Sequence, residues 1–291
     1  MTHYKTLTRA AILGAVLSLS GVAHSAEYRM GIFAGSASKD NQTELKAMYK
    51  PLVDYIAKAT GDTIKPEISQ SFGNMGRHLG NSRYSLFLGP PHVTAAAIEE
   101  GFEPVAKWNK PLFSIYMVLA DSPYKTIGDL KGARLGVASR DTVAGPLCIN
   151  AMNKAGLKAD KDFASVYEGK FMDVMSRQVE EKGLDALCAG PGVWKGMNES
   201  SPGKFRAIGE SVKVPGFAFS IDSELSEKEK KKLTDVLVGM GQNPEGLRAL
   251  QAISGSAAGA TDTLATTAKE YFTANLLVEE KKRRFNAQIP K

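Results

Sequence analysis

The strongest constraint on the fold of this chain is a short apolar strand that runs directly into the start of a helix. A short polar helix (127–131) ends at Gly132, and the apolar residues 133–138 follow. A polar turn at 139–142 then leads into a helix that begins near Val143. The first N–H groups of a helix have no partner inside it and point toward whatever precedes it, which suits an anion. A second strand-to-helix turn, residues 87–92, lies upstream, and two such turns facing each other would line a binding cleft.

Strands and helices alternate along most of the chain, which predicts mainly parallel α/β sheets covered by helices. The pattern runs through residues 28–101, restarts after the β-rich run 113–120, and gives way to helices after Ser226. We therefore predict two α/β lobes: lobe one from 27–118 plus 218–291, and lobe two from 119–217. The chain would cross near 113–121 and 208–221, so a hinge of two segments would place a ligand between the lobes.

The first 26 residues have the pattern of a cleavable export signal. Lys5 and Arg9 form a positive region, residues 10–22 are an apolar run, and Ala23-His24-Ser25 places small residues where a signal peptidase reads them. Cleavage is predicted after Ser25 or after Ala26. No later run approaches the ~18 apolar residues of a membrane span, so none is expected in the mature chain.

The charge of the chain argues against nucleic acid as a partner. The formal net charge is +6, and removing Lys5 and Arg9 leaves +4. The basic cluster Lys281 to Arg284 near the C-terminus is typical of a solvated helix end. A small anionic ligand suits this balance better.

Four segments resemble the phosphate/phosphite/phosphonate-binding family of periplasmic binding proteins. They are 50–56 (KPLVDYI), 87–90 (FLGP), 126–132 (TIGDLKG), and 155–157 (AGL) followed by 160–163 (DKDF). Their order and spacing extend the resemblance from about residue 29 to 221. It implies a type II periplasmic binding fold, a periplasmic location, and delivery of an oxyanion to the permease of an ABC importer, with no cofactor or metal.

The resemblance implies that the turn after the strand 133–138 holds the ligand oxygens. The family turn is rich in serine and threonine, whereas this chain has Ser139, Asp141, Thr142, Val143 and Ala144 there. A carboxylate repels an anion, so Asp141 is expected to cap the helix more readily than to contact ligand. Thr142 is an alternative cap.

The resemblance also implies contacts from other elements. The family aromatic of lobe one matches Phe72, and the family histidine of lobe two falls where Lys170 is the comparable donor. His92, in the second strand-to-helix turn, is the preferred lobe-one contact, although a structural role is equally open. The acidic residue that binds an aminoalkyl group in some members falls near Gly190 and is absent, so an aminoalkylphosphonate is disfavoured.

Cys148 and Cys188 leave three possibilities open. In an oxidising compartment a pair of cysteines commonly forms a disulfide. Two separate buried thiols are the second possibility. The third is a functional thiol at the cleft, which would favour a soft ligand such as trivalent arsenic.

Two functions fit these features. The first is a solute-binding protein for a small oxyanion; the alternative is a periplasmic sensor of the same fold, for an oxyanion or arsenite, that signals to a membrane histidine kinase. An enzyme is not expected, since only His78 and His92 remain after the signal and no nucleophile or metal motif accompanies them.

Overall fold

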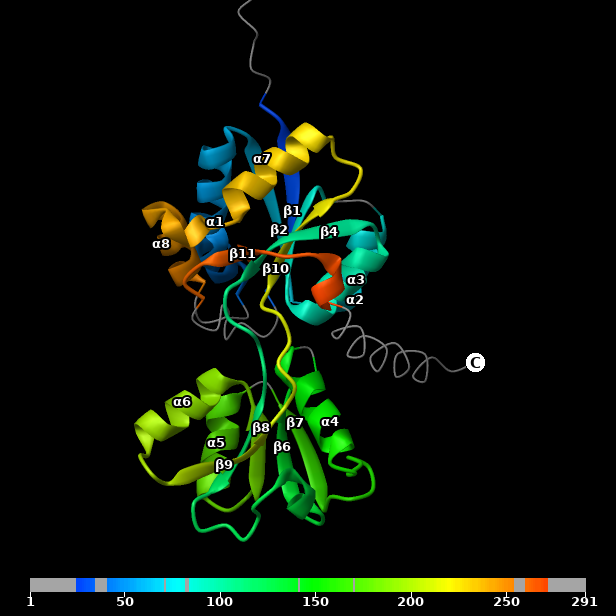
Figure 1. The fold of residues 1–291 in the computed structure, drawn as a ribbon. Helices are drawn as coiled ribbons and strands as arrows, with labels where there is room; N and C mark the ends of the chain where they lie inside the picture. The colour runs from blue at the N-terminus through cyan, green and yellow to red at the C-terminus, as the bar shows by residue number, and fades with distance from the viewer. Residues whose placement is uncertain are drawn as a thin grey trace, which may run out of the picture.

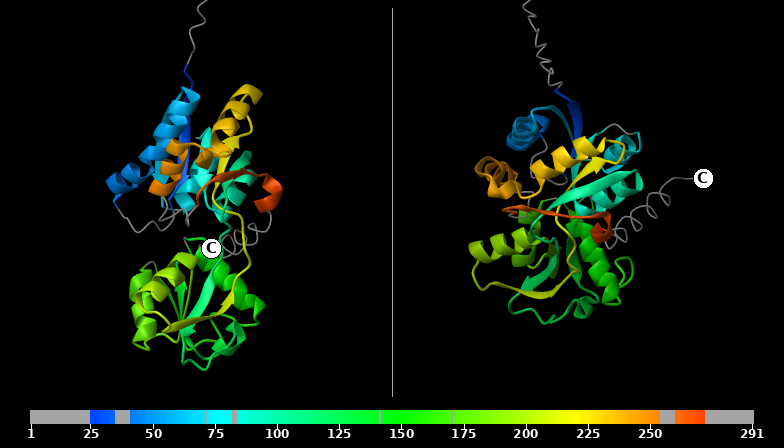
Figure 2. Two further views of the ribbon diagram at one scale, coloured as in Figure 1. Left: turned by 60° about the vertical axis from the view of Figure 1, so that its left-hand side comes forward. Right: turned by 45° about the horizontal axis from the view of Figure 1, so that its top comes forward.

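The structure is a computed structural model that describes residues 25–34, 41–70, 72–81, 84–140, 142–169, 171–253 and 260–271. Most of the predicted signal, residues 254–259 and the basic cluster Lys281 to Arg284 therefore lie outside the described residues, as do Asp141 and Lys170. Within the described part the chain forms two α/β lobes joined by two extended segments (Figures 1 and 2).

Lobe one contains a six-stranded sheet in the order β11-β4-β10-β3-β1-β2. β1 runs parallel to β2 and β3, whereas β10 runs antiparallel to β3 and β4. The strands are β1 (Glu27–Phe33), β2 (Thr63–Ser69), β3 (Leu86–Gly89), β4 (Phe102–Trp108), β10 (Ala218–Asp222) and β11 (Thr263–Ala265). β10 and β11 run opposite to the other four strands, so this is a mixed sheet rather than a purely parallel one.

Lobe two contains a five-stranded sheet in the order β7-β6-β8-β5-β9. β6 runs parallel to β7 and β8, and β5 runs antiparallel to β8 and β9. The strands are β5 (Ile115–Leu119), β6 (Arg134–Ala138), β7 (Ser165–Gly169), β8 (Ala186–Ala189) and β9 (Phe205–Glu210). Because β6, β7 and β8 are parallel, their carboxyl ends lie on one edge of the sheet.

Capping residues mark both ends of the long helix α1. In α1 (Gln42–Thr60) the Asn41 side chain accepts from the Thr43 N–H, and Gly61 ends the helix with a φ of 71°. That left-handed conformation favours glycine, which has no Cβ to clash. The other helices of lobe one are α2 (Phe72–Gly80), α3 (Pro91–Glu99), α7 (Glu227–Leu237), η2 (Met240–Gln242), α8 (Pro244–Ala252) and η3 (Ala268–Tyr271). Those of lobe two are η1 (Ile127–Leu130), α4 (Ala144–Lys154), α5 (Met172–Glu180) and α6 (Pro191–Ser200).

Each lobe has an apolar core, and the lobe-one cluster also includes Leu147 of α4 and residues of the crossing segments. The larger core lies in lobe one, where Leu233 of α7 and Leu250 of α8 pack with residues of α1, β1 and β3. In lobe two, α4 packs with β6 and β8 on one face of the sheet, while α5 packs with β5 and β8 on the other. The chain after β10 therefore returns to lobe one (Figure 1).

The two crossing segments, 109–114 and 211–217, are linked by hydrogen bonds between Leu112 and Val214, whose N–H and C=O groups pair at 2.9 Å in both directions. At the lobe-one end Trp108 stacks on Phe217 with ring centroids 4.2 Å apart. β5 already belongs to the lobe-two sheet, so the first crossing ends before Ile115 rather than at the expected boundary of 118. The reason is that the run 113–120 pairs with β8 and β9, which sequence periodicity does not reveal.

None of the helices within the described residues is long and apolar enough to cross a membrane.

Candidate functional site

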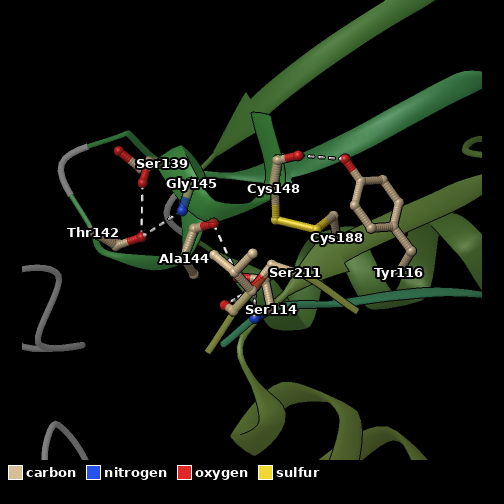
Figure 3. The surroundings of a disulfide bond; sticks show 10 residues. Ser114, Tyr116, Ser139, Thr142, Ala144, Gly145, Cys148, Cys188 and Ser211 are labelled. Carbon is tan, nitrogen blue, oxygen red and sulfur yellow. Dashed lines mark hydrogen bonds between the residues drawn. A yellow bond between two sulfur atoms is a disulfide. The ribbon is translucent and has the colours of Figure 1, made fainter. Parts of the chain in front are cut away.

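The turn between β6 and α4 is closed by Thr142. The Thr142 N–H and hydroxyl both donate to the carbonyl oxygen of Ser139, at 2.9 and 2.8 Å. The Thr142 hydroxyl oxygen also accepts from the Gly145 N–H at 3.3 Å (Figure 3). Thr142 therefore satisfies one N–H group of the first turn of α4 as a capping residue does.

The N–H groups of Val143 and Ala144 have no hydrogen-bond acceptor among the residues that the structure describes. They stand at the start of α4, where the aligned peptide dipoles give a partial positive charge. Both residues are partly accessible to solvent. Among the described residues the turn thus presents two donors without an acceptor and a positive helix end, which is a geometry that suits an oxyanion.

Gly145 allows α4 to start this close to the strand. A Cβ at this position would lie 2.5 Å from the carbonyl oxygens of both Ala138 and Ser139. Because these are backbone atoms, a side chain would push the helix away from the turn. The glycine therefore fixes where the free N–H groups sit.

Arg140 and Glu168 form an ion pair that sequence reasoning missed. Their Nε and Oε2 atoms are 2.7 Å apart, and the Arg140 N–H donates to Glu168 Oε1 at 2.6 Å. Arg140 follows β6, and Glu168 lies near the end of β7, the adjacent parallel strand. The register of the two strands pairs Val137 with Glu168. Only that register brings the two side chains together, so spacing in the sequence gave no signal. The ion pair leaves Arg140 with little net charge to offer a ligand.

Helix α4 is tied to the hinge and to β5 through its carbonyl groups. The Ser114 hydroxyl donates to the Ala144 carbonyl at 3.0 Å, and the Tyr116 hydroxyl donates to the Cys148 carbonyl at 2.7 Å (Figure 3). Ser114 also donates its N–H to the Ser211 hydroxyl, which is on the other crossing segment. Burial raises the pKa of Tyr116, so its hydroxyl stays a donor at any physiological pH. The turn is therefore mechanically linked to the hinge.

Cys148 and Cys188 are joined by a disulfide that ties α4 to β8, with Cα atoms 5.9 Å apart (Figure 3). Of the three possibilities left by the sequence, the structure therefore contains the first. Both sulfur atoms are buried in the core of lobe two. With both thiols in the bridge, neither one is available to a soft ligand.

His92 is buried in lobe one rather than presented on a surface. Its side chain and backbone together are 1 % exposed, and its ring lies edge-on to Phe33 with centroids 6.1 Å apart. A ligand contact from His92 would need some movement at the start of α3 and stays a prediction.

Three other predicted contacts are not placed by the structure. Phe72 begins α2, but its side chain is not described, and Asp141 and Lys170 lie outside the described residues. The structure thus brings together Ser139, Thr142, Val143 and Ala144, and sets His92 apart in the other lobe. Trp194 packs against a core of lobe two.

No group of three or more histidine, cysteine, aspartate or glutamate side chains that could hold a metal ion occurs in the described part of the chain.

Comparison with known proteins gives one family match and several similar structures. Residues 34–266 match the family described as ABC transporter, phosphonate, periplasmic substrate-binding protein. A binding protein component of an ABC phosphonate transporter from Pseudomonas aeruginosa has a TM-score of 0.64 at 16% identity, over 92% of this chain and 90% of that one.

Two further structures resemble the chain more closely in shape. PhnD1 from Prochlorococcus marinus, in complex with methylphosphonate, has a TM-score of 0.69 at 14% identity, over 88% of this chain and 98% of that one. A Xanthomonas citri protein bound to ATP has a TM-score of 0.72 at 15% identity, over 89% and 99%. At these identities the likeness confirms the predicted two-lobe α/β fold, and the family match covers most of the chain.

Proposed function

The chain belongs to the phosphonate-binding family of periplasmic substrate-binding proteins of ABC transporters, and we propose that it captures a small tetrahedral oxyanion between its lobes for an ABC importer. Phosphate, phosphite and a simple alkylphosphonate are the candidates. The family is one of binding proteins rather than enzymes, as expected from the lack of a catalytic motif. The observation that carries the proposal is the pair of N–H groups of Val143 and Ala144 at the start of α4, which have no acceptor within the part of the chain that the structure describes.

The chemistry of the turn fits a phosphorus oxyanion. Two backbone N–H groups can each donate to a separate oxygen, and hydrogen bonds to an anion are roughly twice as strong as those between neutral groups. Thr142 holds the turn in shape, since its hydroxyl already bonds to Ser139 and Gly145. Arg140 is committed to Glu168. Selection of the anion would therefore depend on dipoles and N–H groups more than on a full opposite charge.

Further contacts are proposed from the elements that surround this turn. Lys170 follows β7, whose carboxyl end lies beside that of β6, and could add a positive charge. Ser139 and Asp141 complete the turn, with Asp141 proposed as a capping group. Phe72 and His92 are the proposed lobe-one contacts, reached when the lobes close. The methylphosphonate and ATP named for the two relatives both carry a tetrahedral phosphorus oxyanion, which supports this ligand class.

Closure of the lobes would complete the site. In the proposed mechanism the anion first binds the α4 turn, and rotation about the two crossing segments then brings lobe one over it. The closed form would be the one that the permease recognises. The hydrogen bond from Ser114 to Ala144 joins the hinge to the turn, so a movement of one would displace the other.

A panel of anions tests the proposal. Phosphate, phosphite, methylphosphonate, sulfate, arsenate and arsenite are added separately, with and without reductant, and the melting temperature is measured. A ligand that binds only the folded state raises the melting temperature by mass action, by an amount set by its concentration over Kd. Small-angle scattering should then show a smaller radius of gyration with that ligand. No shift with any phosphorus oxyanion would refute the proposal.

Thr142 provides matched variants for the same assay. Thr142→Val removes the hydroxyl that orders the turn, and we expect at least a ten-fold weaker Kd for the best anion together with a loss of about 1 kcal/mol in stability. Thr142→Ser keeps the hydroxyl and should bind nearly as the wild type does. Equal Kd values for the valine and serine variants would show that the turn does not hold the ligand.

The arsenite arm addresses the sensor alternative. With Cys148 and Cys188 in a disulfide, arsenite should give no shift unless reductant is present. A shift with arsenite alone under oxidising conditions, lost in Cys188→Ser, would favour the sensor over the importer component.

A further inference from the structure

The backbone nitrogen of Ala26 lies beside a buried carboxylate. It donates to Asp62 Oδ1 at 3.0 Å, and the Asp62 side chain is 2% exposed. The Ala26 carbonyl accepts from the Thr63 N–H at 2.9 Å, which continues the pairing of β1 with β2 by one residue. Ala26 is partly buried, whereas Ser25 before it is exposed. The peptide bond between them thus marks the edge of the folded lobe.

Asp62 lies near a second carboxylate and pairs with one lysine of α7. Its other oxygen, Oδ2, pairs with Lys232 Nζ of α7 at 2.5 Å. Glu229, also on α7, accepts from the Tyr28 hydroxyl at 3.3 Å. The pKa of Tyr28 is raised to about 12 by burial and then by the charges of Glu229 and Asp62, which shows that both carboxylates act at this point. Two carboxylates therefore face one ammonium group here.

Neighbouring charges do not make up the difference. Glu27, the next residue of β1, pairs with Lys65 of β2 at 2.8 Å, so this pair adds no net charge. A buried carboxylate is stable only when it is paired and hydrogen-bonded. One additional cation at the Ala26 nitrogen would balance the group.

The sequence before Ala26 shows how that cation arises. Ala23 and Ser25 are the small residues that an export peptidase needs three positions and one position before the cut, if the cut follows Ser25. A cut after Ala26 would instead place His24, a large side chain, three positions before it. It would also remove the nitrogen that contacts Asp62.

We infer that export processing cleaves the Ser25–Ala26 bond and that the new α-ammonium of Ala26 is bound by Asp62. Water attacks the Ser25 carbonyl carbon and the C–N bond breaks, so Ser25 leaves as a carboxylate and the Ala26 nitrogen becomes an ammonium. That nitrogen already lies within hydrogen-bond distance of Asp62 Oδ1. The hydrogen bond from a neutral amide N–H to this carboxylate becomes an ion pair that joins β1 to the α1–β2 turn and to α7. Processing thus stabilises the mature protein.

The pair has a defined pH dependence. A free α-amino group has a pKa of about 7.7–8.0, and a buried carboxylate partner raises it. Its stabilisation is therefore fully present below the unfolded pKa and is lost as the pH rises through the higher folded value. The groups facing it are Asp62, Glu229, Lys232 and Tyr28.

Two measurements test the inference. The full precursor is exported in a Gram-negative host and the N-terminus of the periplasmic protein is sequenced; Ala26 is expected, whereas Glu27 or an unprocessed chain would overturn the assignment. The melting temperatures of a protein that begins at Ala26 and one that retains Ser25 are then compared at pH 7. The first should melt a few degrees higher, since roughly 2–4 °C corresponds to each 1 kcal/mol in a chain of this size.

Controls separate the ion pair from other effects. The difference in melting temperature between the two proteins should disappear when both carry Asp62→Asn, and it should be smaller at pH 10 than at pH 7. Equal melting temperatures of the two proteins with Asp62 intact would by themselves refute the ion pair. Ala26 lies at the start of β1, at the opposite end of the strand from the proposed site. Methylphosphonate affinity should therefore be the same for both proteins, so failure of this inference is distinct from failure of the proposed function.

Discussion

At the residue scale, the positions that shape the candidate site are small ones. Gly145 lets α4 begin close to the carbonyl groups of Ala138 and Ser139. The Thr142 hydroxyl closes the turn by donating to the Ser139 carbonyl. Neither residue carries a charge. The anion-binding property of the turn comes from backbone groups that these two residues hold in place.

Gly145→Ala should therefore damage both binding and stability. The added Cβ would meet two backbone oxygens at 2.5 Å, and relief requires the helix start to move. We expect a loss of about 1–3 kcal/mol, as for other overpacked sites, with a weaker Kd for the anion. Denaturant unfolding and calorimetric titration measure the two effects.

Gly196→Ala is the matched control, because a Cβ there meets nothing within 4 Å inside α6. It should leave Kd unchanged and raise stability by up to about 1 kcal/mol. If both variants behave alike, the close packing at Gly145 does not determine the turn.

At the scale of the elements, lobe two is held together by contacts at both ends of its parallel strands. The Cys148–Cys188 disulfide joins α4 to β8 near the site. At the opposite end Asp185, just before β8, accepts from the Arg134 backbone N–H at 2.8 Å and from its Nη2 at 2.7 Å.

Removing the disulfide should destabilise lobe two. The bridge spans 40 residues, and closing a loop of that length restricts the unfolded chain by roughly 4 kcal/mol in the chain-entropy account. Cys148→Ala with Cys188→Ala should show a loss of this order in thermal unfolding. Reductant should lower the melting temperature of the wild type and leave that of the double variant unchanged. A wild-type melting temperature that does not change with reductant would show that the disulfide is absent.

Asp185→Asn should cost stability in a pH-dependent way. Hydrogen bonds from the Arg134 side chain, then its backbone N–H and its charge, lower the pKa of Asp185. Its contribution is thus present above the unfolded pKa of about 3.9 and is lost as the pH falls through the lower folded value. We expect a loss of about 1 kcal/mol at pH 7, since the exposed arginine is screened by solvent, and a gap that closes once the pH is below the lowered folded pKa.

The exposed Lys195–Glu199 pair offers the comparison for that experiment. Its side chains are 75% and 67% exposed, so Glu199→Gln should change the unfolding midpoint very little at either pH. A pH-independent effect of Asp185→Asn would assign its cost to packing instead of charge.

At the scale of the whole molecule, the hinge determines how the lobes meet. Trp108 stacks on Phe217 where the crossing segments leave lobe one, and Gly216 lies against the carbonyl oxygens of Trp108 and Lys110. The Tyr271 hydroxyl donates to the Gly216 carbonyl at 3.0 Å, which also fixes the second crossing segment at Gly216.

Gly216→Ala should alter the hinge without touching the α4 turn. Its Cβ would lie 2.7 and 2.8 Å from those two backbone oxygens, so the segments must separate. We expect a loss of about 1–3 kcal/mol and a changed radius of gyration in the absence of ligand. Small-angle scattering with and without methylphosphonate measures this, and Gly196→Ala again serves as control. Unchanged scattering in both states would show that the hinge tolerates the side chain.

Much of the fold follows from local patterns in the sequence. The alternation of strands and helices predicted two α/β lobes and the strand-to-helix turn at 139–142. Three strands were missed: β4, β9 and β11. β4 contains Pro104 and β11 has only three residues, so neither gives a clear alternating signal; both are stabilised by pairing with neighbours in the sheet.

The sequence by itself determined where most of the strands and the strand-to-helix turns occur, because these depend on residues a few positions apart. The tertiary structure alone decided which distant groups meet. Arg140 finds Glu168 through strand register, Cys148 reaches Cys188 across the sheet, and Ala26 reaches Asp62 through the pairing of β1 with β2. These contacts join residues 28 to 40 positions apart along the chain. Local spacing in the sequence does not reveal which distant elements pack together or which of their side chains face each other. The turn was therefore predictable as a possible site for an anion, while its support and the burial of His92 were not.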